Sequence, residues 1–180
     1  PRAASNFGWP APAYTLPGTN SQQPTLASCR GTNGLLVAFI CNHCPYVQAI
    51  LDRFIRDAIE LQRHGIGVVA ISSNDAVSYP EDAFPEMVNL AQARSFPFPY
   101  LYDESQSVAR AYDAVCTPDF FGFNRALELQ YRGRLDASGR NPAPPDATRE
   151  LFSAMLAVAT TGIGPRTQTP SIGCSLKWKS

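Results

Sequence analysis

Apolar residues follow two different rhythms in the part of the chain that begins at residue 35. Residues 35–40 are apolar without a break, which predicts a buried strand. Apolar residues then recur at helical spacing, at 47, 50, 51, 54, 55, 58 and 59, and predict a helix that ends near residues 64–65. Residues 66–72 are again largely apolar, so the pattern begins as strand, helix, strand.

The same pattern continues into the C-terminal half of the chain. It predicts a helix over residues 85–94, a short strand over 99–102, a brief helix over 106–112, an antiparallel hairpin of strands 119–124 and 128–134, and a last helix over 148–160. Because strands and helices alternate before the hairpin, we expect parallel strands with an antiparallel pair at one edge. The predicted fold class is α/β, a central mixed sheet with helices on both faces.

Proline and glycine mark the two ends of the chain as irregular. They interrupt residues 1–34 throughout, so this lead-in predicts only short strands and turns, with a hairpin around residues 13–16. Residues 136–146 predict a long loop, and residues 164–180 an extended tail. We therefore expect a single domain over residues 1–180, in which the lead-in is not a domain of its own.

The composition narrows the classes of partner. The 180 residues include 15 basic and 15 acidic side chains, and 44% of them are hydrophobic, which is typical of one globular domain. Balanced charge gives no electrostatic reason to expect nucleic acid or an anionic membrane as a partner. The longest apolar run, residues 35–41, is far shorter than the ~20 residues of a membrane-spanning helix.

The cysteines and the first residues of the chain give an expectation about the cellular compartment. Five cysteines, an odd number that includes one C-x-x-C, are more typical of an intracellular redox or metal protein than of a disulfide framework. No secretory signal is visible, so a cytoplasmic location is the expectation. The chain does not begin with Met, which leaves a trimmed leader open.

The candidate chemistry lies at the first strand-to-helix junction, where Cys41 and Cys44 enclose Asn42 and His43. Two thiols at this spacing can close into a disulfide, and the exposed N–H groups of a helix N-terminus stabilise a thiolate. His43 is expected to add positive charge and lower a thiol pKa further. The motif therefore predicts a dithiol redox site.

Helix-capping preferences favour Cys44 as the thiolate at the helix tip. Proline is favoured at the first helical position, and the residue before a proline is pushed out of the α region. Cys44 therefore fits the N-cap position and Pro45 fits the first helical position. Cys41 is then the expected resolving partner, because only a short loop has to close.

A metal site and a cofactor are not expected. A structural zinc ion needs four ligands, and the chain has no second closely spaced pair of cysteines. Cys29, Cys116 and Cys174 are isolated along the sequence, and the only other histidine is His64.

Several segments resemble motifs of the thioredoxin-like superfamily, in its peroxiredoxin-like branch of redoxin and thiol-specific antioxidant proteins. They are residues 39–47, 116–121, 131–134 and 170–174. The resemblance implies a thioredoxin-like fold with an inserted β-α unit. It also implies a cis bond between Thr117 and Pro118, in a loop that lies against the reactive cysteine and offers backbone groups to an extended substrate. Members range from disulfide oxidoreductases to peroxidases and inactive relatives, so the reaction is implied only loosely.

The resemblance leaves two registers open for the active-site pair. In one, Cys41 and Cys44 match the two cysteines of thioredoxins. In the other, Cys44 is the first cysteine and Val47 takes the place of the second. The step from Cys44 to Pro45 also resembles the Cys-Pro of many peroxiredoxins, with Cys41 where those enzymes have threonine.

Two further cysteines have open roles. Cys116 directly precedes Thr117, so it is either a third thiol near the site or a buried residue at a strand edge. Cys174 lies in the tail, where many peroxiredoxins carry a resolving cysteine, or it is a bystander.

The expected function is that of a thiol–disulfide oxidoreductase acting on thiols and disulfides of proteins or small molecules. A thiol peroxidase, with peroxide as substrate, is the first alternative, and it needs an arginine next to the reactive cysteine. Arg125, Arg132 and Arg134 are candidates near the hairpin, although solvated surface arginines are the commoner outcome. A redox-inactive binding module of the same fold is the second alternative.

Overall fold

The computed structural model describes residues 7–180, so the first six residues of the predicted lead-in lie outside the described residues. The elements in chain order are α1 (Leu26–Cys29), β1 (Gly34–Phe39), α2 (Pro45–Arg63), β2 (Ile66–Ser72), the 3₁₀ turn η2 (Pro80–Asp82), α3 (Phe84–Ala93), β3 (Tyr100–Tyr102), α4 (Ser107–Tyr112), β4 (Cys116–Thr117), β5 (Asp119–Asn124), β6 (Leu129–Gly133), α5 (Glu150–Thr161) and β7 (Cys174–Ser175). The predicted order of main strands and helices is confirmed, with small shifts at their ends. None of the described helices is both long and apolar enough to span a bilayer.

Five strands form the central mixed sheet. β1, β5 and β6 are joined by antiparallel pairing, and β2 pairs in parallel with β3. β2 runs beside β1, where the Ile40 amide donates a hydrogen bond of 3.0 Å to the Ile71 carbonyl. The expected arrangement, with an antiparallel pair at one edge, is therefore confirmed. Along the chain, β3 and α4 come between β2 and β5, where they form the expected inserted β-α unit.

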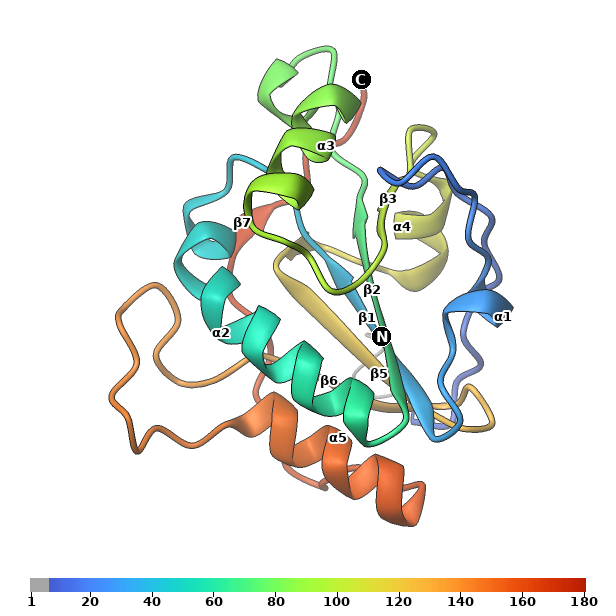
Figure 1. Ribbon diagram of the computed structural model, residues 1–180, viewed down its shortest axis with the longest axis vertical. Helices are drawn as coiled ribbons and strands as arrows, with labels where there is room; N and C mark the ends of the chain where they lie inside the picture. Colours follow the sequence, from blue (N-terminus) through green and yellow to red (C-terminus); the bar gives the residue numbers. More distant parts are fainter. Residues whose placement is uncertain (1–6) are drawn as a thin grey trace.

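Helices cover both faces of this sheet, because successive side chains of a strand point to opposite faces. Figure 1 shows α2 and α5 on one face, and α4 with the N-terminal segment on the other. Leu36 and Ala38 of β1 pack toward α2 and α5, whereas Leu35 and Val37 pack toward α4. Most of the predicted apolar period of α2 is buried, at Val47, Ile50, Leu51, Phe54 and Ala58, whereas Ile55 is partly buried and Ile59 is exposed.

The lead-in differs from its prediction in two respects. It contains α1, a single helical turn that Thr25 caps in a reciprocal arrangement with Ser28. The expected hairpin around residues 13–16 is reduced to an isolated bridge between Thr15 and Thr25. A one-turn helix has no apolar period, so only the capping residues could have indicated it.

The tail is tied to the body of the protein. β7 pairs with β4 in antiparallel fashion, and the Leu176 amide donates a hydrogen bond of 3.1 Å to the Val115 carbonyl. Gly173 allows this close approach, since a Cβ there would collide with the Thr117 carbonyl oxygen. A two-residue strand in a segment without alternating apolar residues gives no sequence signal, and the sequence predicted only an extended tail.

Candidate active site

The loop between β1 and α2 sets the position of the two candidate thiols. α2 begins at Pro45, and Cys44 is its N-cap with an extended backbone (φ −70°, ψ 123°), as the capping preferences predict. Cys41 and Cys44 are both buried, with 1% and 0% of their surface exposed. The reactive end of the helix is therefore closed to solvent in this structure.

The loop around Thr117 meets the thiols. The Cys44 thiol donates a hydrogen bond of 3.3 Å to the Thr117 carbonyl, and the Cys41 sulfur lies 3.5 Å from the Thr117 hydroxyl. The bond between Thr117 and Pro118 is cis. Residues 41, 44 and 117, predicted separately from two distant parts of the sequence, are thus in contact.

The pKa values of the two thiols are shifted in opposite directions. The pKa of Cys44 is lowered to about 4, mainly because Cys41 donates a hydrogen bond to it, with further hydrogen bonds from Cys174 and Thr117. Burial opposes this shift. The pKa of Cys41 is raised by the same hydrogen bond and by burial. Cys44 is therefore the group that ionises, and Cys41 keeps its proton.

The remaining two candidate thiols lie near this pair but stay protonated. Cys174 contacts Cys44, and burial followed by this contact raises the pKa of Cys174. Cys116 instead has its sulfur 3.5 Å from the Pro118 carbonyl, and burial raises its pKa to about 12. Cys29 lies apart, at the end of α1.

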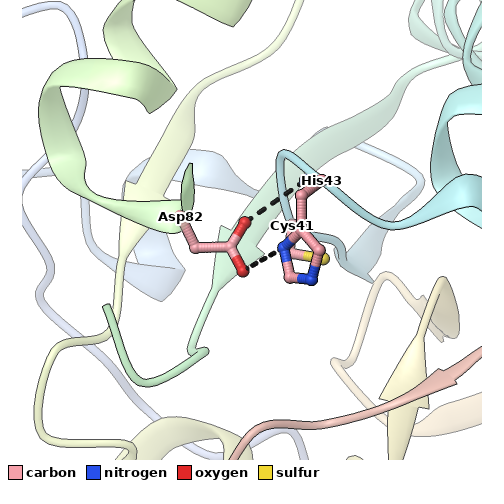
Figure 2. Close-up of side chains that lie close together, drawn as sticks. All are labelled: Cys41, His43 and Asp82. Atoms are coloured by element: carbon pink, nitrogen blue, oxygen red, sulfur yellow. Dashed lines mark hydrogen bonds and ion pairs between the residues drawn. The ribbon is translucent and has the colours of Figure 1, made fainter. Parts of the chain in front are cut away.

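His43 lies beside the Cys41 sulfur and pairs with Asp82. Its Nδ1 atom faces the Asp82 carboxylate at 2.6 Å, as Figure 2 shows, and the lowered pKa of Cys44 is caused first by Cys41. His43 is thus not among the causes of the lowered Cys44 pKa, and its expected effect on a thiol stays a prediction. Asp82, at the end of η2, is a residue that sequence reasoning missed.

Asn74 connects Asp82 to the tail. The Asn74 side-chain amide donates a hydrogen bond of 2.9 Å to Asp82, and its oxygen accepts one of 2.9 Å from the Lys177 amide. Asn74 closely follows β2, at the carboxyl edge of the sheet where sites of α/β proteins gather, and this position is the sequence signal for a polar cluster here.

The three arginines near the hairpin are engaged elsewhere. Arg132 is buried against Asp119 at 2.9 Å, Arg134 pairs with Glu150 at 2.9 Å, and Arg125 donates a hydrogen bond of 3.1 Å to Asn33. Among the described residues, none of these arginines is hydrogen-bonded to Cys44. The peroxide-polarising arginine of a thiol peroxidase therefore has no counterpart among the candidates that the sequence named.

A cavity of about 540 Å³ opens beside the cis-proline loop. Tyr46, Pro118 and Ile172 line one side, and the long loop over residues 136–141 lines the other. Arg53 holds this loop in place through Asp136, at 2.9 Å. The cavity lies next to the helix tip and can receive part of a substrate.

Comparisons with known proteins agree with this architecture. The family model described as the AhpC/TSA family matches residues 7–134. Two similar crystal structures are of an uncharacterized conserved protein from Geobacillus kaustophilus and a hypothetical protein from Sinorhizobium meliloti 1021. The first has 42% identity and a TM-score of 0.90 over 96% of this chain and 92% of that one. The second has 40% identity and a TM-score of 0.88 over 97% and 95%.

A more distant structure, a thiol:disulfide interchange protein of the thioredoxin family from Chlorobium tepidum TLS, shares the fold. It has 15% identity and a TM-score of 0.63, over 84% of this chain and 96% of that one. The expected thioredoxin-like fold is thereby confirmed. A search of curated proteins found no match.

Proposed function

Because the chain belongs to the AhpC/TSA family, we propose that it is a thiol–disulfide oxidoreductase with Cys44 as the nucleophile. The family itself indicates a thiol redox function, with thiols, disulfides or peroxide as substrates. The observation that favours disulfide exchange is that the Cys41 and Cys44 sulfurs meet at Thr117, 3.5 and 3.3 Å from its hydroxyl and carbonyl oxygens, with the pKa of Cys44 lowered and that of Cys41 raised. Such a pair supplies a nucleophile and a second thiol for resolution.

The reaction proceeds in two exchanges. The Cys44 thiolate attacks one sulfur of a substrate disulfide, so a mixed disulfide forms and the other substrate sulfur leaves as a thiolate that takes a proton from water. Cys41 then loses its proton and attacks the Cys44 sulfur, which releases the second substrate thiolate. The substrate is reduced to two thiols, the protein is oxidised to a Cys41–Cys44 disulfide, and an external dithiol restores it.

The His43–Asp82 pair supports the second exchange. Both side chains have polar atoms within 4.8 Å of the Cys41 sulfur, which keeps its proton until that step. The imidazole is the group that accepts this proton, and the buried carboxylate stabilises the resulting imidazolium.

Substrate access requires a movement of the tail. Cys44 is fully buried, and Cys174 contacts it from β7. We propose that β7 shifts away from β4 when substrate enters, which exposes the Cys44 sulfur next to the cavity at Pro118.

Reduction of an aromatic disulfide by the protein, with a dithiol as the electron donor, tests this proposal. Cys44→Ser abolishes turnover, Cys41→Ser stops it at a mixed disulfide, and Cys29→Ser, outside the cluster, retains it. Peptide mapping of the oxidised wild type yields the Cys41–Cys44 disulfide.

Two outcomes contradict the proposal. Consumption of hydrogen peroxide together with a Cys44 disulfide that survives in Cys41→Ser but is lost in Cys174→Ser identifies a two-cysteine peroxidase instead. Absence of both activities, with capture of a partner retained, identifies a redox-inactive binding module instead.

A further inference from the structure

A second cluster of chemically active side chains adjoins the thiol pair. The Cys41 sulfur, a ring nitrogen of His43 and a carboxylate oxygen of Asp82 all lie within 4.8 Å of one another. Figure 2 shows them converging from two parts of the chain, the loop before α2 and the end of η2. Cysteine sulfur, histidine nitrogen and carboxylate oxygen are the ligand types that zinc binds in proteins.

The distances suit a single small cation. Zinc bonds of about 2.0–2.3 Å in tetrahedral geometry place neighbouring ligand atoms about 3–4 Å apart. The three atoms here lie within 4.8 Å of one another, with the His43 and Asp82 atoms 2.6 Å apart, so side-chain rotations that separate this pair slightly bring all three around one ion.

Asp82 is held as a ligating carboxylate commonly is. Its carboxylate is fully buried. One carboxylate oxygen accepts a hydrogen bond of 2.8 Å from the Asn42 backbone N–H, and the other accepts one of 2.9 Å from the Asn74 side-chain amide. Contacts of this kind orient a ligand and hold it ready for a metal.

His43 and Asp82 approach each other without a well-directed hydrogen bond. The His43 Nδ1 atom lies 2.6 Å from an Asp82 oxygen, yet it makes no hydrogen bond of acceptable geometry. The ring also stacks on Tyr79, with centroids 5.8 Å apart, so surrounding contacts hold it in place. Because this separation is shorter than the spacing of two zinc ligands, the two side chains must move slightly apart to share one cation.

We propose that the reduced protein binds one zinc ion through Cys41, His43 and Asp82, with water as the fourth ligand. On binding, the Cys41 S–H bond breaks, its proton passes to water and a sulfur–zinc bond forms, with no change in oxidation state. The thiolate and the carboxylate neutralise the dication. His43 has 26% of its side chain exposed, which leaves a solvent-facing side for the water. Three protein ligands with one open position is a known zinc arrangement that the four-ligand argument from sequence did not consider.

The site would exist in only one redox state. The Cys41 sulfur cannot bond to zinc and to the Cys44 sulfur at once, so a Cys41–Cys44 disulfide and the metal exclude each other. Zinc is thus expected to protect the reduced pair, and oxidation to release the ion.

Titration of chelator-treated, reduced protein with zinc in a calorimeter tests the proposal, and Co²⁺ serves as a spectroscopic probe for a thiolate–metal bond. The expected result is one ion per chain. Asp82→Asn and His43→Asn weaken zinc binding at least about tenfold, and Cys41→Ser removes the thiolate–cobalt absorption. Asp75→Asn and Cys116→Ser are matched controls outside the cluster and retain both signals. His43→Asn alters a partly exposed side chain, so it tests the site even where Asp82→Asn fails to fold.

Two results overturn the proposal. One is the absence of binding at one ion per chain. The other is binding that survives His43→Asn and Asp82→Asn but is lost in Cys44→Ser and Cys174→Ser, because the thiols alone would then hold the metal. The titration involves no turnover, so its failure leaves the proposed disulfide exchange untouched.

Discussion

Thr117 and Cys174 face each other as direct partners in the antiparallel pairing of β4 and β7. This register brings the Cys174 thiol against Cys44, whose sulfur lies 3.3 Å from the Thr117 carbonyl oxygen. The chain's C-terminal segment therefore covers the group with the lowest thiol pKa. Access to that group depends on how tightly the tail is held.

Gly173→Ala is expected to loosen the tail. An added Cβ collides with the Thr117 carbonyl oxygen, which is backbone and cannot rotate away, so β7 must shift. Cys44 then reacts faster with iodoacetamide, as peptide mapping of timed samples can measure. Ile163→Ala, at an exposed position outside the cavity beside Pro118, serves as the control and leaves the labelling rate unchanged. Equal rates in both variants would show that the tail does not limit access.

Cys41→Ala is expected to raise the pKa of Cys44 from about 4 toward the ordinary thiol value, because it removes the hydrogen bond that contributes most to the lowering. Ultraviolet thiolate absorbance against pH, in reduced and chelator-treated protein, measures the shift. Cys29→Ser keeps the wild-type titration. An unchanged midpoint in Cys41→Ala would mean that the contacts other than Cys41, from Cys174, Thr117 and the helix N-terminus, hold the thiolate.

The stability of the reduced protein is expected to depend on pH through Cys44. Its folded-state pKa of about 4 lies below the unfolded value of ~8.5, so ionisation stabilises the folded state. This contribution is complete above ~8.5 and is lost as the pH falls toward about 4. Urea unfolding of wild type and Cys44→Ser across this range measures it. A difference between the two proteins that stays constant with pH would contradict the shifted pKa.

Asp119→Ala is expected to cost about 3–5 kcal/mol of unfolding free energy. It leaves the Arg132 guanidinium buried without its carboxylate partner, 2.9 Å away in the wild type. Urea denaturation provides the measurement. Asp52→Ala removes an exposed carboxylate from its pair with Arg94 and is the matched control, with a much smaller expected cost. Similar losses of unfolding free energy in the two variants would show that the buried pair contributes no more to stability than the exposed pair.

Local rules predicted the helix tip because they act within a few residues. The preference for Pro45 at the first helical position and the restriction on the residue before it suffice to make Cys44 the N-cap. The alternation of strands and helices likewise predicted the mixed sheet, since each element buries a face that its own spacing defines.

The partners of His43 and Cys44 could not be predicted in this way. Asp82 reaches His43 because a 3₁₀ turn after β2 brings it across the carboxyl edge of the sheet, and no local pattern encodes that distance. Cys174 reaches Cys44 through a two-residue strand whose pairing depends on the tertiary position of β4. In both cases the contact is a property of the folded arrangement and leaves no periodicity in the sequence.

Asn74 gives the site a thermodynamic link between its two ends. Its amide nitrogen binds Asp82 and its oxygen binds the Lys177 amide, so one side chain must satisfy both neighbours at once. Any event that reorients Asp82 changes the free energy of docking the tail. Undocking the tail in turn changes the free energy of reorienting Asp82, by the same coupling energy. The two processes are therefore reciprocal, although one concerns the neighbourhood of Cys41 and the other the strand that covers Cys44.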